Sequence, residues 1–235
     1  AERQTTFTGE LDALRDAGTR LQALDGEIGA ASAAWRTAAD ALGTARAAAA
    51  GRLSQATSAL IAELGMGGGR FEVALEPVAG DRPDPQGGER AEFLVSANAG
   101  QPPRPLRRVA SGGELSRISL AIEVAALGSD AVPTMVFDEV DSGIGGAVAE
   151  IVGQKLRALG ETRQVLCVTH LPQVAAQGHG HYRVSKADRD GVTHSAVQRL
   201  DAKQRAEELA RMLGGVEVTK EARAAAKRLL AGGRG

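Results

Sequence analysis

Two adjacent carboxylates, Asp138 and Glu139, follow directly after a short apolar run, and a third, Asp141, comes two residues later. The run is brief and β-rich, lies between a proline and a glycine, and is typical of a buried strand. Ligands bind at the carboxyl ends of strands in open α/β sheets. Two adjacent acids there suit a Mg²⁺-phosphate site, where one holds the metal through its waters and the next positions or deprotonates an attacking water. A strand that simply ends in a solvated acidic turn is the alternative.

A second apolar run, residues 164–169, ends in His170. If the two strands are neighbours, His170 shares a sheet edge with Asp138 and Glu139, since carboxyl ends of parallel strands lie together. A histidine in that position is a candidate to contact a terminal phosphate. A structural or solvated histidine in a turn is the alternative.

The residues Ser111, Gly112, Gly113 and Glu114 open an apolar helix. Such a turn leaves backbone N–H groups and a hydroxyl at the helix N-terminus, where the dipole favours an anion. Ordinary N-capping by Ser111, with Glu114 closing a capping box, is the alternative. The two interpretations are compatible, because a capped N-terminus can also receive a phosphate from a partner.

A phosphate-binding loop of the Walker A type is not present in the sequence. The Gly-rich segment 65–70 has no Lys and Ser or Thr after its last glycine, and no Gly–Lys dipeptide occurs anywhere in the chain. The sequence therefore predicts no Walker A motif in this chain.

Residues 9–64 predict a long helix, because they are rich in alanine and poor in β-branched residues. Apolar residues recur at alternating steps of three and four, which is typical of a coiled-coil seam. Asp25–Gly26 is a possible break, and residues 1–8 are expected to fray. A helix with one apolar stripe needs a partner, expected from an upstream segment or another molecule, with a local helical bundle as the alternative. We expect a helical arm over 1–64 and a globular lobe over 65–235.

The composition sets outer limits on function. The 28 Lys and Arg nearly balance the 29 Asp and Glu, so global charge favours no class of partner. The single cysteine, Cys167, excludes an internal disulfide and is expected to be a packed thiol. No run of 18 apolar residues occurs, which predicts a cytoplasmic protein without a membrane partner.

The lobe is predicted to be α/β. Strands over 70–77 and 90–98 are expected to form a hairpin whose long tip is the Pro- and Gly-rich loop 80–88, and a second hairpin is expected over 181–186 and 193–200. The parallel strands described above are expected to carry flanking helices, including 147–159, with further helices over 202–213 and 219–230. Asp201 is the predicted N-cap of the helix over 202–213, with Gln204 at the capping-box position. Arg104, Arg107 and Arg108 lie in an extended connector, where a solvated loop and a phosphate-backbone contact are both possible.

The motifs together resemble those of ABC-type ATPases. Ser111–Glu114 resembles the signature motif, Met135–Glu139 resembles Walker B with its catalytic glutamate, and Asp141 lies where the D-loop follows. Val168–His170 resembles the switch-histidine segment. The long helix before the lobe is similar to that of the SMC-like subgroup, whose coiled coil interrupts the ATPase head. The amino-acid sequences of several stretches resemble those of a bacterial family of DNA repair proteins within this subgroup. The Gly-rich stretch after Asp141 differs from the sequence that SMC proteins have at this point, so the role of Asp141 stays open.

The resemblance implies the C-terminal lobe of an ATPase head that binds ATP and Mg²⁺. Asp138 would help hold the metal, Glu139 would orient the attacking water, and His170 would contact the γ-phosphate. Ser111, Gly112, Gly113 and Glu114 would close over ATP on an opposite head, with Asp141 lining the interface. Implied partners are double-stranded DNA ends, a second copy in an ATP-sandwiched homodimer, and the N-terminal lobe and outgoing coiled-coil arm of the same protein.

The implied function is ATP-driven head pairing coupled to DNA end tethering in double-strand break repair and recombination, in a nucleoid-associated protein. Without a Walker A lobe, this chain alone is expected to be inactive. Two alternatives come from other classes. One is a non-catalytic helical assembly or DNA-binding module, which a salt-dependent DNA affinity insensitive to nucleotide would favour. The other is the nucleotide-binding half of an ABC transporter.

Overall fold

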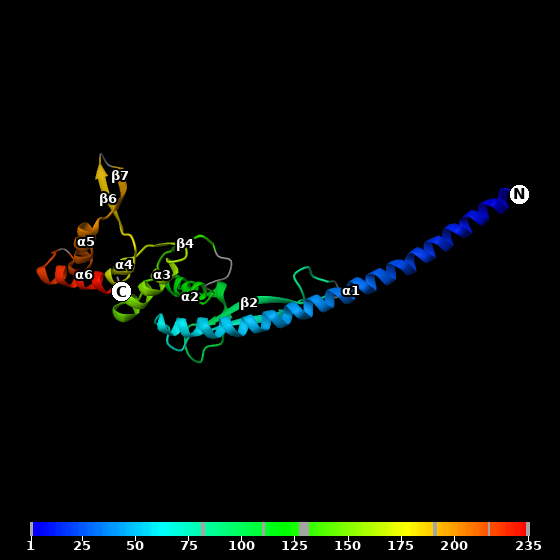
Figure 1. Ribbon diagram of the computed structural model, residues 1–235, viewed down its shortest axis with the longest axis horizontal. Helices are drawn as coiled ribbons and strands as arrows, with labels where there is room; N and C mark the ends of the chain where they lie inside the picture. The colour runs from blue at the N-terminus through cyan, green and yellow to red at the C-terminus, as the bar shows by residue number, and fades with distance from the viewer. Residues whose placement is uncertain are drawn as a thin grey trace. The chain divides into compact units, whose positions relative to one another are not determined.

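The computed structural model of the chain describes residues 2–80, 83–109, 111–126, 132–189, 192–215 and 217–233 (Figure 1). These residues form two compact units. The first comprises residues 1–50 and 74–92, and the second comprises 51–73 and 93–235. The helices are α1 (Glu2–Glu63), α2 (Gly112–Ala125), α3 (Gly146–Leu159), α4 (Pro172–Gln177), α5 (Ala202–Gly214) and α6 (Lys220–Gly232), with a 3₁₀ turn at Leu106–Arg108. The strands are β1 (Arg70–Pro77), β2 (Glu89–Ser96), β3 (Arg104–Pro105), β4 (Thr134–Phe137), β5 (Gln164–Cys167), β6 (Tyr182–Arg189) and β7 (Val192–Arg199).

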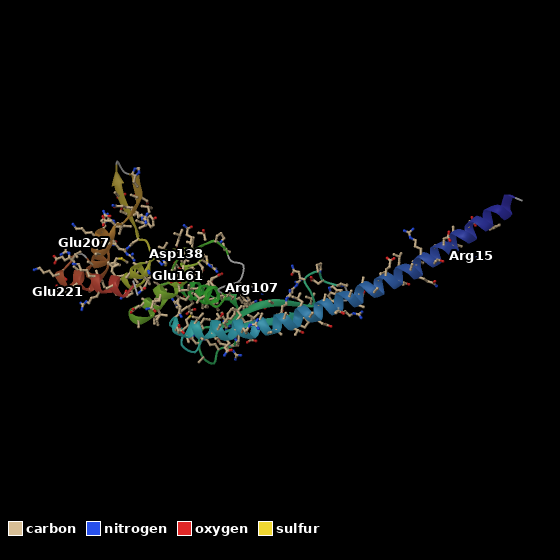
Figure 2. The ribbon with its side chains drawn as sticks, viewed as in Figure 1. Arg15, Arg107, Asp138, Glu161, Glu207 and Glu221 are labelled. Carbon is tan, nitrogen blue, oxygen red and sulfur yellow. The ribbon has the colours of Figure 1, made fainter. Side chains whose placement is uncertain are left out.

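Helix α1 is one unbroken helix of 62 residues. The possible break at Asp25–Gly26 does not occur, and the fraying expected for residues 1–8 is wrong, because the helix already begins at Glu2. Good helix formers and the absence of proline outweigh a cost of about 1 kcal/mol for each glycine. Leu21 and Ile28 of the apolar stripe are each 63% exposed, and side chains such as Arg15 stand out from this stretch (Figure 2).

In the first unit, the loop segment 83–88 between β1 and β2 lies against α1. Trp35 Nε1 donates a hydrogen bond to the Asp84 carbonyl oxygen at 2.9 Å. Gly87 has a φ of +97°, and a Cβ added there would lie 3.0 Å from Leu42 Cδ2. The sequence predicted a hairpin with a long tip, and the structure shows that the tip is fastened to the helix.

In the second unit, the last turns of α1 join the main apolar core. Ile61 and Leu64 are fully buried together with Phe71 of β1. The edge of β1 is also bonded to α1, because Ser58 Oγ accepts a hydrogen bond from Phe71 N at 3.0 Å. The end of the arm helix is therefore part of the globular core. The core also includes Ile118 and Leu120 of α2, Val140, and Val152, Leu156 and Leu159 of α3.

The strands form three sheets, with orders β1-β2-β3, β4-β5 and β6-β7. Strands β4 and β5 are parallel, with Thr134 paired to Gln164 and Phe137 to Cys167. Strands β6 and β7 form the predicted antiparallel hairpin, and the described side chains over 182–188 and 193–199 are all exposed. The predicted α/β class, with a parallel strand pair, flanking helices and a hairpin, is confirmed.

Helices α4, α5 and α6 pack around a smaller apolar cluster that contains Ala176, Leu209 and Ala226. The capping box predicted at the start of α5 is present. Asp201 Oδ1 accepts a hydrogen bond from Gln204 N at 2.8 Å, and Gln204 Oε1 accepts one from Asp201 N at 3.0 Å. Among the described residues, no helix is both long and apolar enough to cross a membrane.

Candidate functional site

The carboxyl ends of β4 and β5 lie side by side. Beyond the last strand pair, Val168 N donates a hydrogen bond to the Phe137 carbonyl oxygen at 3.0 Å. The segments that carry Asp138 and His170 therefore leave the sheet at the same edge, as the sequence predicted for neighbouring parallel strands. Asp138 is labelled at this edge in Figure 2.

Asp141 joins the two strand ends. Its side chain is almost completely buried, and Oδ2 accepts hydrogen bonds from Thr169 Oγ1 at 2.5 Å and from His170 N at 3.0 Å. The His170 ring lies against the same carboxylate, with Nδ1 3.2 Å from Asp141 Oδ2, while 71% of the His170 side chain is exposed. The residue that holds His170 is therefore Asp141. The ring itself is presented to solvent.

Asp138 and Glu139 form an ordered turn directly after β4. Asp138 Oδ1 accepts a hydrogen bond from Glu139 N at 2.9 Å, and the Asp138 carbonyl accepts one from Ser116 Oγ at 2.7 Å. Glu139 has a φ of 57°, which is in the left-handed region and is unfavourable for a residue with a Cβ. Such a conformation costs about 1–3 kcal/mol and persists only where the surroundings impose it. Here the Ser142 N–H helps to impose it by donating to the Glu139 carbonyl at 3.0 Å.

The glycine turn at the start of α2 packs against this acidic turn. Ser111 is the N-cap of α2, and its Oγ accepts a hydrogen bond from Glu114 N at 3.4 Å. A Cβ added at Gly112 would collide with Glu139 Oε2, and one added at Gly113 would lie 2.8 Å from Ser142 Cβ. The close approach of the two turns favours glycine mainly at Gly113, where backbone carbonyl oxygens also lie within 3.2 Å of the added Cβ, whereas the Glu139 side chain could move away from a Cβ at Gly112.

Two further residues of α2, which the sequence did not single out, fix this approach. One is Ser116, bonded to Asp138 as described above. The other is Arg117, a buried residue whose NH1 donates to the Ser142 carbonyl at 2.7 Å. Burial lowers the pKa of Arg117, while the nearby Glu114 acts in the opposite direction. The sequence signal that could have found Arg117 is its position four residues after Gly113, on the same helix face.

The edge carries a negative field. The thiol of Cys167 at the end of β5 has its pKa raised to about 12, first by burial and then by Asp141 and Asp138. This agrees with the expectation of a packed, unreactive cysteine.

Asp138 is the candidate metal ligand at this edge. Among the described residues, no group of three or more His, Cys, Asp or Glu side chains could hold a metal ion. Asp138 is exposed, and the oxygen of its carboxylate that accepts a hydrogen bond within the turn is Oδ1. One carboxylate of this kind fits Mg²⁺, which is usually held by one or two carboxylates together with waters and substrate phosphates.

One face of the β4–β5 pair is uncovered among the described residues. Val136 is 67% exposed, Val168 62% and Leu166 48%. In open parallel sheets both faces are normally covered. The described residues therefore leave this apolar face of the strand pair without the covering layer that such a sheet normally has.

Known proteins resemble the chain over almost its whole length. It is 61% identical over 230 residues to the DNA repair protein RecN of Xylella fastidiosa, an alignment that covers 98% of this chain. This chain belongs to the RecN family. The RecN of Vibrio cholerae is 44% identical over 90% of the chain, and that of Haemophilus influenzae is 42% identical over 97%. No protein-family model matches the chain.

The chain spans 41% of the length of the Xylella RecN. Membership of the RecN family agrees with the predicted fold class, a C-terminal lobe of an SMC-like, ABC-type head preceded by a long helix. A solved Smc head domain with a coiled coil, from Pyrococcus yayanosii, aligns with 65% of this chain at 26% identity and a TM-score of 0.48. That likeness is too distant to add to the conclusion from the RecN relatives.

Proposed function

We propose that this chain provides one half of an ATP-hydrolysing head in an SMC-like DNA repair protein, and that ATP-driven pairing of two heads tethers double-stranded DNA ends. One observation carries the proposal. Three segments far apart in the sequence, at Gly112, at Asp138–Glu139 and at His170, meet at one edge of the parallel strand pair through the contacts described above. Their residue types are those that an ATP site of this class needs.

Bound ATP with Mg²⁺ would supply the phosphoryl group and the cation that neutralises its charge. Asp138 would hold the metal with the carboxylate oxygen that the turn leaves exposed. Glu139 would accept the proton of the attacking water. His170 would turn Nε2 toward the γ-phosphate, because Asp141 holds the ring on its Nδ1 side, and as an imidazolium it would donate from Nε2 to the phosphate and from Nδ1 to Asp141. We assign Asp141 the role of a positioning residue for His170, and its contribution to a head interface stays a prediction.

The signature residues act on a second head in this proposal. Ser111 is exposed at the start of α2, where its hydroxyl and the neighbouring backbone N–H groups can receive a phosphate from outside the chain. Gly112, Gly113 and Glu114 belong to the same first turn. ATP would join two copies, and hydrolysis would release them. The uncovered apolar face of β4–β5 supports the presence of a second lobe, which would also supply the phosphate-binding loop.

The proposal is tested by blocking the signature turn in the full-length protein. The substitution Ser111→Arg places a long side chain where the opposite head's phosphate must approach. We expect the variant to bind ATP but to stay monomeric in light-scattering measurements with ATP, under conditions where the unmodified protein dimerises.

The matched control is Thr219→Arg. Thr219 caps α6 as Ser111 caps α2, with its side chain accepting from Ala222 N at 3.2 Å, so both variants lose an N-cap hydrogen bond worth about 1 kcal/mol. The control should dimerise normally. Equal dimerisation of both variants with ATP would rule out a role of this turn in head pairing.

A further inference from the structure

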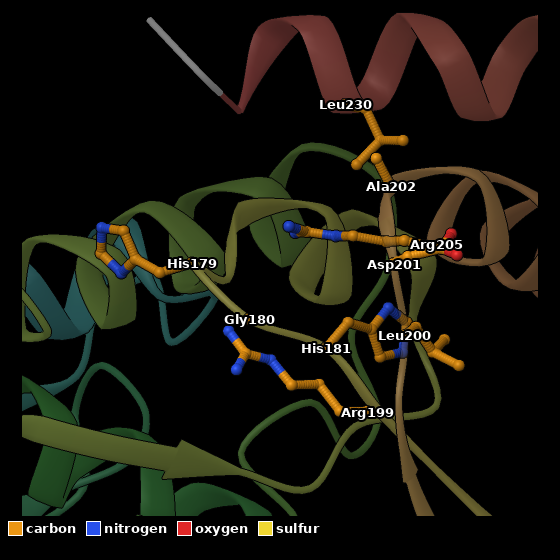
Figure 3. A pocket seen from close by; sticks show the side chains of 9 residues that line it. All are labelled: His179, Gly180, His181, Arg199, Leu200, Asp201, Ala202, Arg205 and Leu230. Carbon is orange, nitrogen blue, oxygen red and sulfur yellow. The ribbon is translucent and has the colours of Figure 1, made fainter.

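A cavity lies in the second unit, formed by segments that the proposed ATP site does not use. The cavity has a volume of about 220 Å³ and is lined by residues from the α4–β6 connection, the end of β7 and the start of α5. Two arginines and two histidines contribute to its wall: His179, His181, Arg199 and Arg205. Figure 3 shows the His181 ring between the side chains of Arg199 and Arg205 in this view.

Arg205 is held rigidly at the wall. Its NH2 group donates hydrogen bonds to the carbonyl oxygens of Ala175, Ala176 and Gly178, at 2.9, 2.8 and 2.6 Å. These are carbonyls at the C-terminal end of α4, so the guanidinium caps that helix. Carbonyl dipoles orient the group but leave its full positive charge in place, and that charge faces the cavity.

The acidic residue of the cavity wall is already engaged. Asp201 is the N-cap of α5, and its Oδ1 accepts the hydrogen bond from Gln204 N within the capping box. The N-terminus of α5 also opens at this wall, and its dipole adds to the positive potential. With both histidines neutral, the lining carries two positive charges against one negative charge.

His181 adds a titratable group and an unsatisfied polar atom. Its Nδ1 is buried and makes no hydrogen bond among the described residues. Burial lowers the His181 pKa first, and Arg205 lowers it further, while Glu208 acts in the opposite direction. The Glu208 carboxylate itself forms two ion pairs. Arg211 NH2 lies 2.7 Å from Glu208 Oε1, and Arg183 NH1 lies 3.8 Å from Glu208 Oε2. A buried polar atom of this kind is normally satisfied by a water or a ligand.

We propose that this cavity binds a single phosphate group, through Arg199 and the His181 imidazole, against the fixed charge of Arg205. Arginine pairs with phosphate in a planar, bidentate geometry, and a phosphate oxygen can accept from a ring N–H of His181. The phosphate can belong to a DNA backbone or to a free anion. The proposal does not depend on the ATP site, because none of its residues lies at the β4–β5 edge.

Calorimetric titration of this chain with inorganic phosphate tests the proposal. We expect saturable binding that Arg199→Gln weakens about tenfold, because one charge-assisted contact is lost. Arg199 is exposed, so the variant should keep the far-ultraviolet circular dichroism and melting temperature of the unmodified chain. Lys186→Gln is the control, since Lys186 is an exposed cation of the same hairpin that does not line the cavity, and it should bind as the unmodified chain does.

Sulfate is the probe for pH dependence, because its own charge stays constant over the range in which an imidazole gains a proton. Sulfate affinity should rise as the pH falls from about 7.5 to about 5.5, since the His181 imidazole gains a proton that the anion stabilises. The charged groups that face His181 are Arg199, Arg205, Asp201 and Glu208. The variant His181→Gln should flatten this rise.

Labelled duplex DNA distinguishes the two sources of the phosphate. If the ligand is a backbone phosphate, Arg199→Gln should weaken duplex binding and reduce the slope of log affinity against log salt by about 0.9. If duplex binding is unchanged while binding of inorganic phosphate is lost, the ligand is a free anion. The absence of saturable phosphate binding, or equal weakening by Arg199→Gln and Lys186→Gln, would overturn the proposal and indicate diffuse charge attraction only.

Discussion

The acidic edge at β4–β5 and the basic cavity beside α5 impose opposite fields on a titratable group. At the acidic edge, burial together with Asp141 and Asp138 raises the pKa of Cys167 to about 12. In the basic cavity, burial together with Arg205 lowers the pKa of His181. Burial disfavours the charged form in both cases, and the neighbouring charges reinforce it. The two regions are therefore suited to opposite ligands, a cation with its phosphates at the first and a bare anion at the second.

The two regions also differ in how they are built. The acidic edge uses short runs of adjacent residues that follow two strands. Its oxygens Asp138 Oδ1 and Asp141 Oδ2 accept hydrogen bonds from backbone N–H groups and from the Thr169 hydroxyl. The basic cavity collects single residues from three segments. Substitutions should therefore disturb stability mainly at the acidic edge and ligand binding mainly at the cavity.

The largest effect on stability is expected for Asp141→Asn. The buried carboxylate accepts from Thr169 Oγ1 and His170 N on the same oxygen, Oδ2, and the neutral oxygen of an amide is a weaker acceptor for both donors than a charged carboxylate oxygen. We expect the free energy of unfolding in urea to fall by about 1–3 kcal/mol. Asp138→Asn is the control, because Asp138 is exposed, and its effect should stay within about 0.5 kcal/mol. Equal effects of the two substitutions would contradict the role given to Asp141.

A smaller loss is expected for Gly113→Ala. A Cβ at this position would lie 2.8 Å from Ser142 Cβ and 3.2 Å from the Glu139 carbonyl oxygen, so the two turns must move apart. Overpacking of this kind costs about 1–3 kcal/mol, and we expect the lower end because one neighbour is a side chain at the surface of the turn. Gly67→Ala, with no atom within 4 Å of the added Cβ, should leave the melting temperature nearly unchanged. If both variants melt alike, the turns are not in close contact.

The raised pKa of Cys167 predicts a pH dependence of both reactivity and stability. The folded thiol keeps its proton up to about 12, whereas an unperturbed thiol loses it near 9.0. Its contribution to stability is therefore complete below pH 9.0 and is lost as the pH rises from 9.0 toward 12. Alkylation by iodoacetamide at pH 8.5 should be much slower for the folded chain than for the chain in urea, since the thiolate is the nucleophile. Equal rates would show that the thiol is not protected.

The smallest effect is expected for Asp201→Asn in the cavity. Asparagine caps helices about as well as aspartate, so stability should change by only a few tenths of a kcal/mol. Removal of the negative charge from the cavity wall should tighten phosphate binding a few-fold in the calorimetric titration. Weaker binding by this variant would contradict the assignment of an anion site.

The sequence predicted the features that depend on local pattern. Strand β4 with its two following carboxylates, the neighbouring strand that leads to His170, and the capping box at Asp201 all come from short runs or fixed spacing. What it missed depends on contacts between distant positions. The burial of Asp141 requires the turn after β5 to fold over it, 28 residues further along. The contact between Trp35 and Asp84 spans 49 residues, and no local pattern encodes it.

The same reason explains why the basic cavity could not be predicted. His181 and Arg199 appeared in the sequence only as members of a hairpin, and Arg205 only as a helix residue. Their convergence depends on the packing of α5 against α4, which places Arg205 on the carbonyls of the shorter helix. Arg117 was missed in the same way, because an arginine within a helix is usually solvated and this one is buried against the turn at Ser142.

The most direct test of the proposed half-site is steady-state ATP hydrolysis by the full-length protein carrying Glu139→Gln. Glu139 is held beside Asp138 in a left-handed turn, and the amide keeps its shape but cannot accept the proton of the attacking water. We expect turnover to fall at least about a hundredfold while ATP-dependent dimerisation persists, and Glu150→Gln, at an exposed position of α3, to behave as the unmodified protein does. Undiminished turnover by Glu139→Gln would contradict the account.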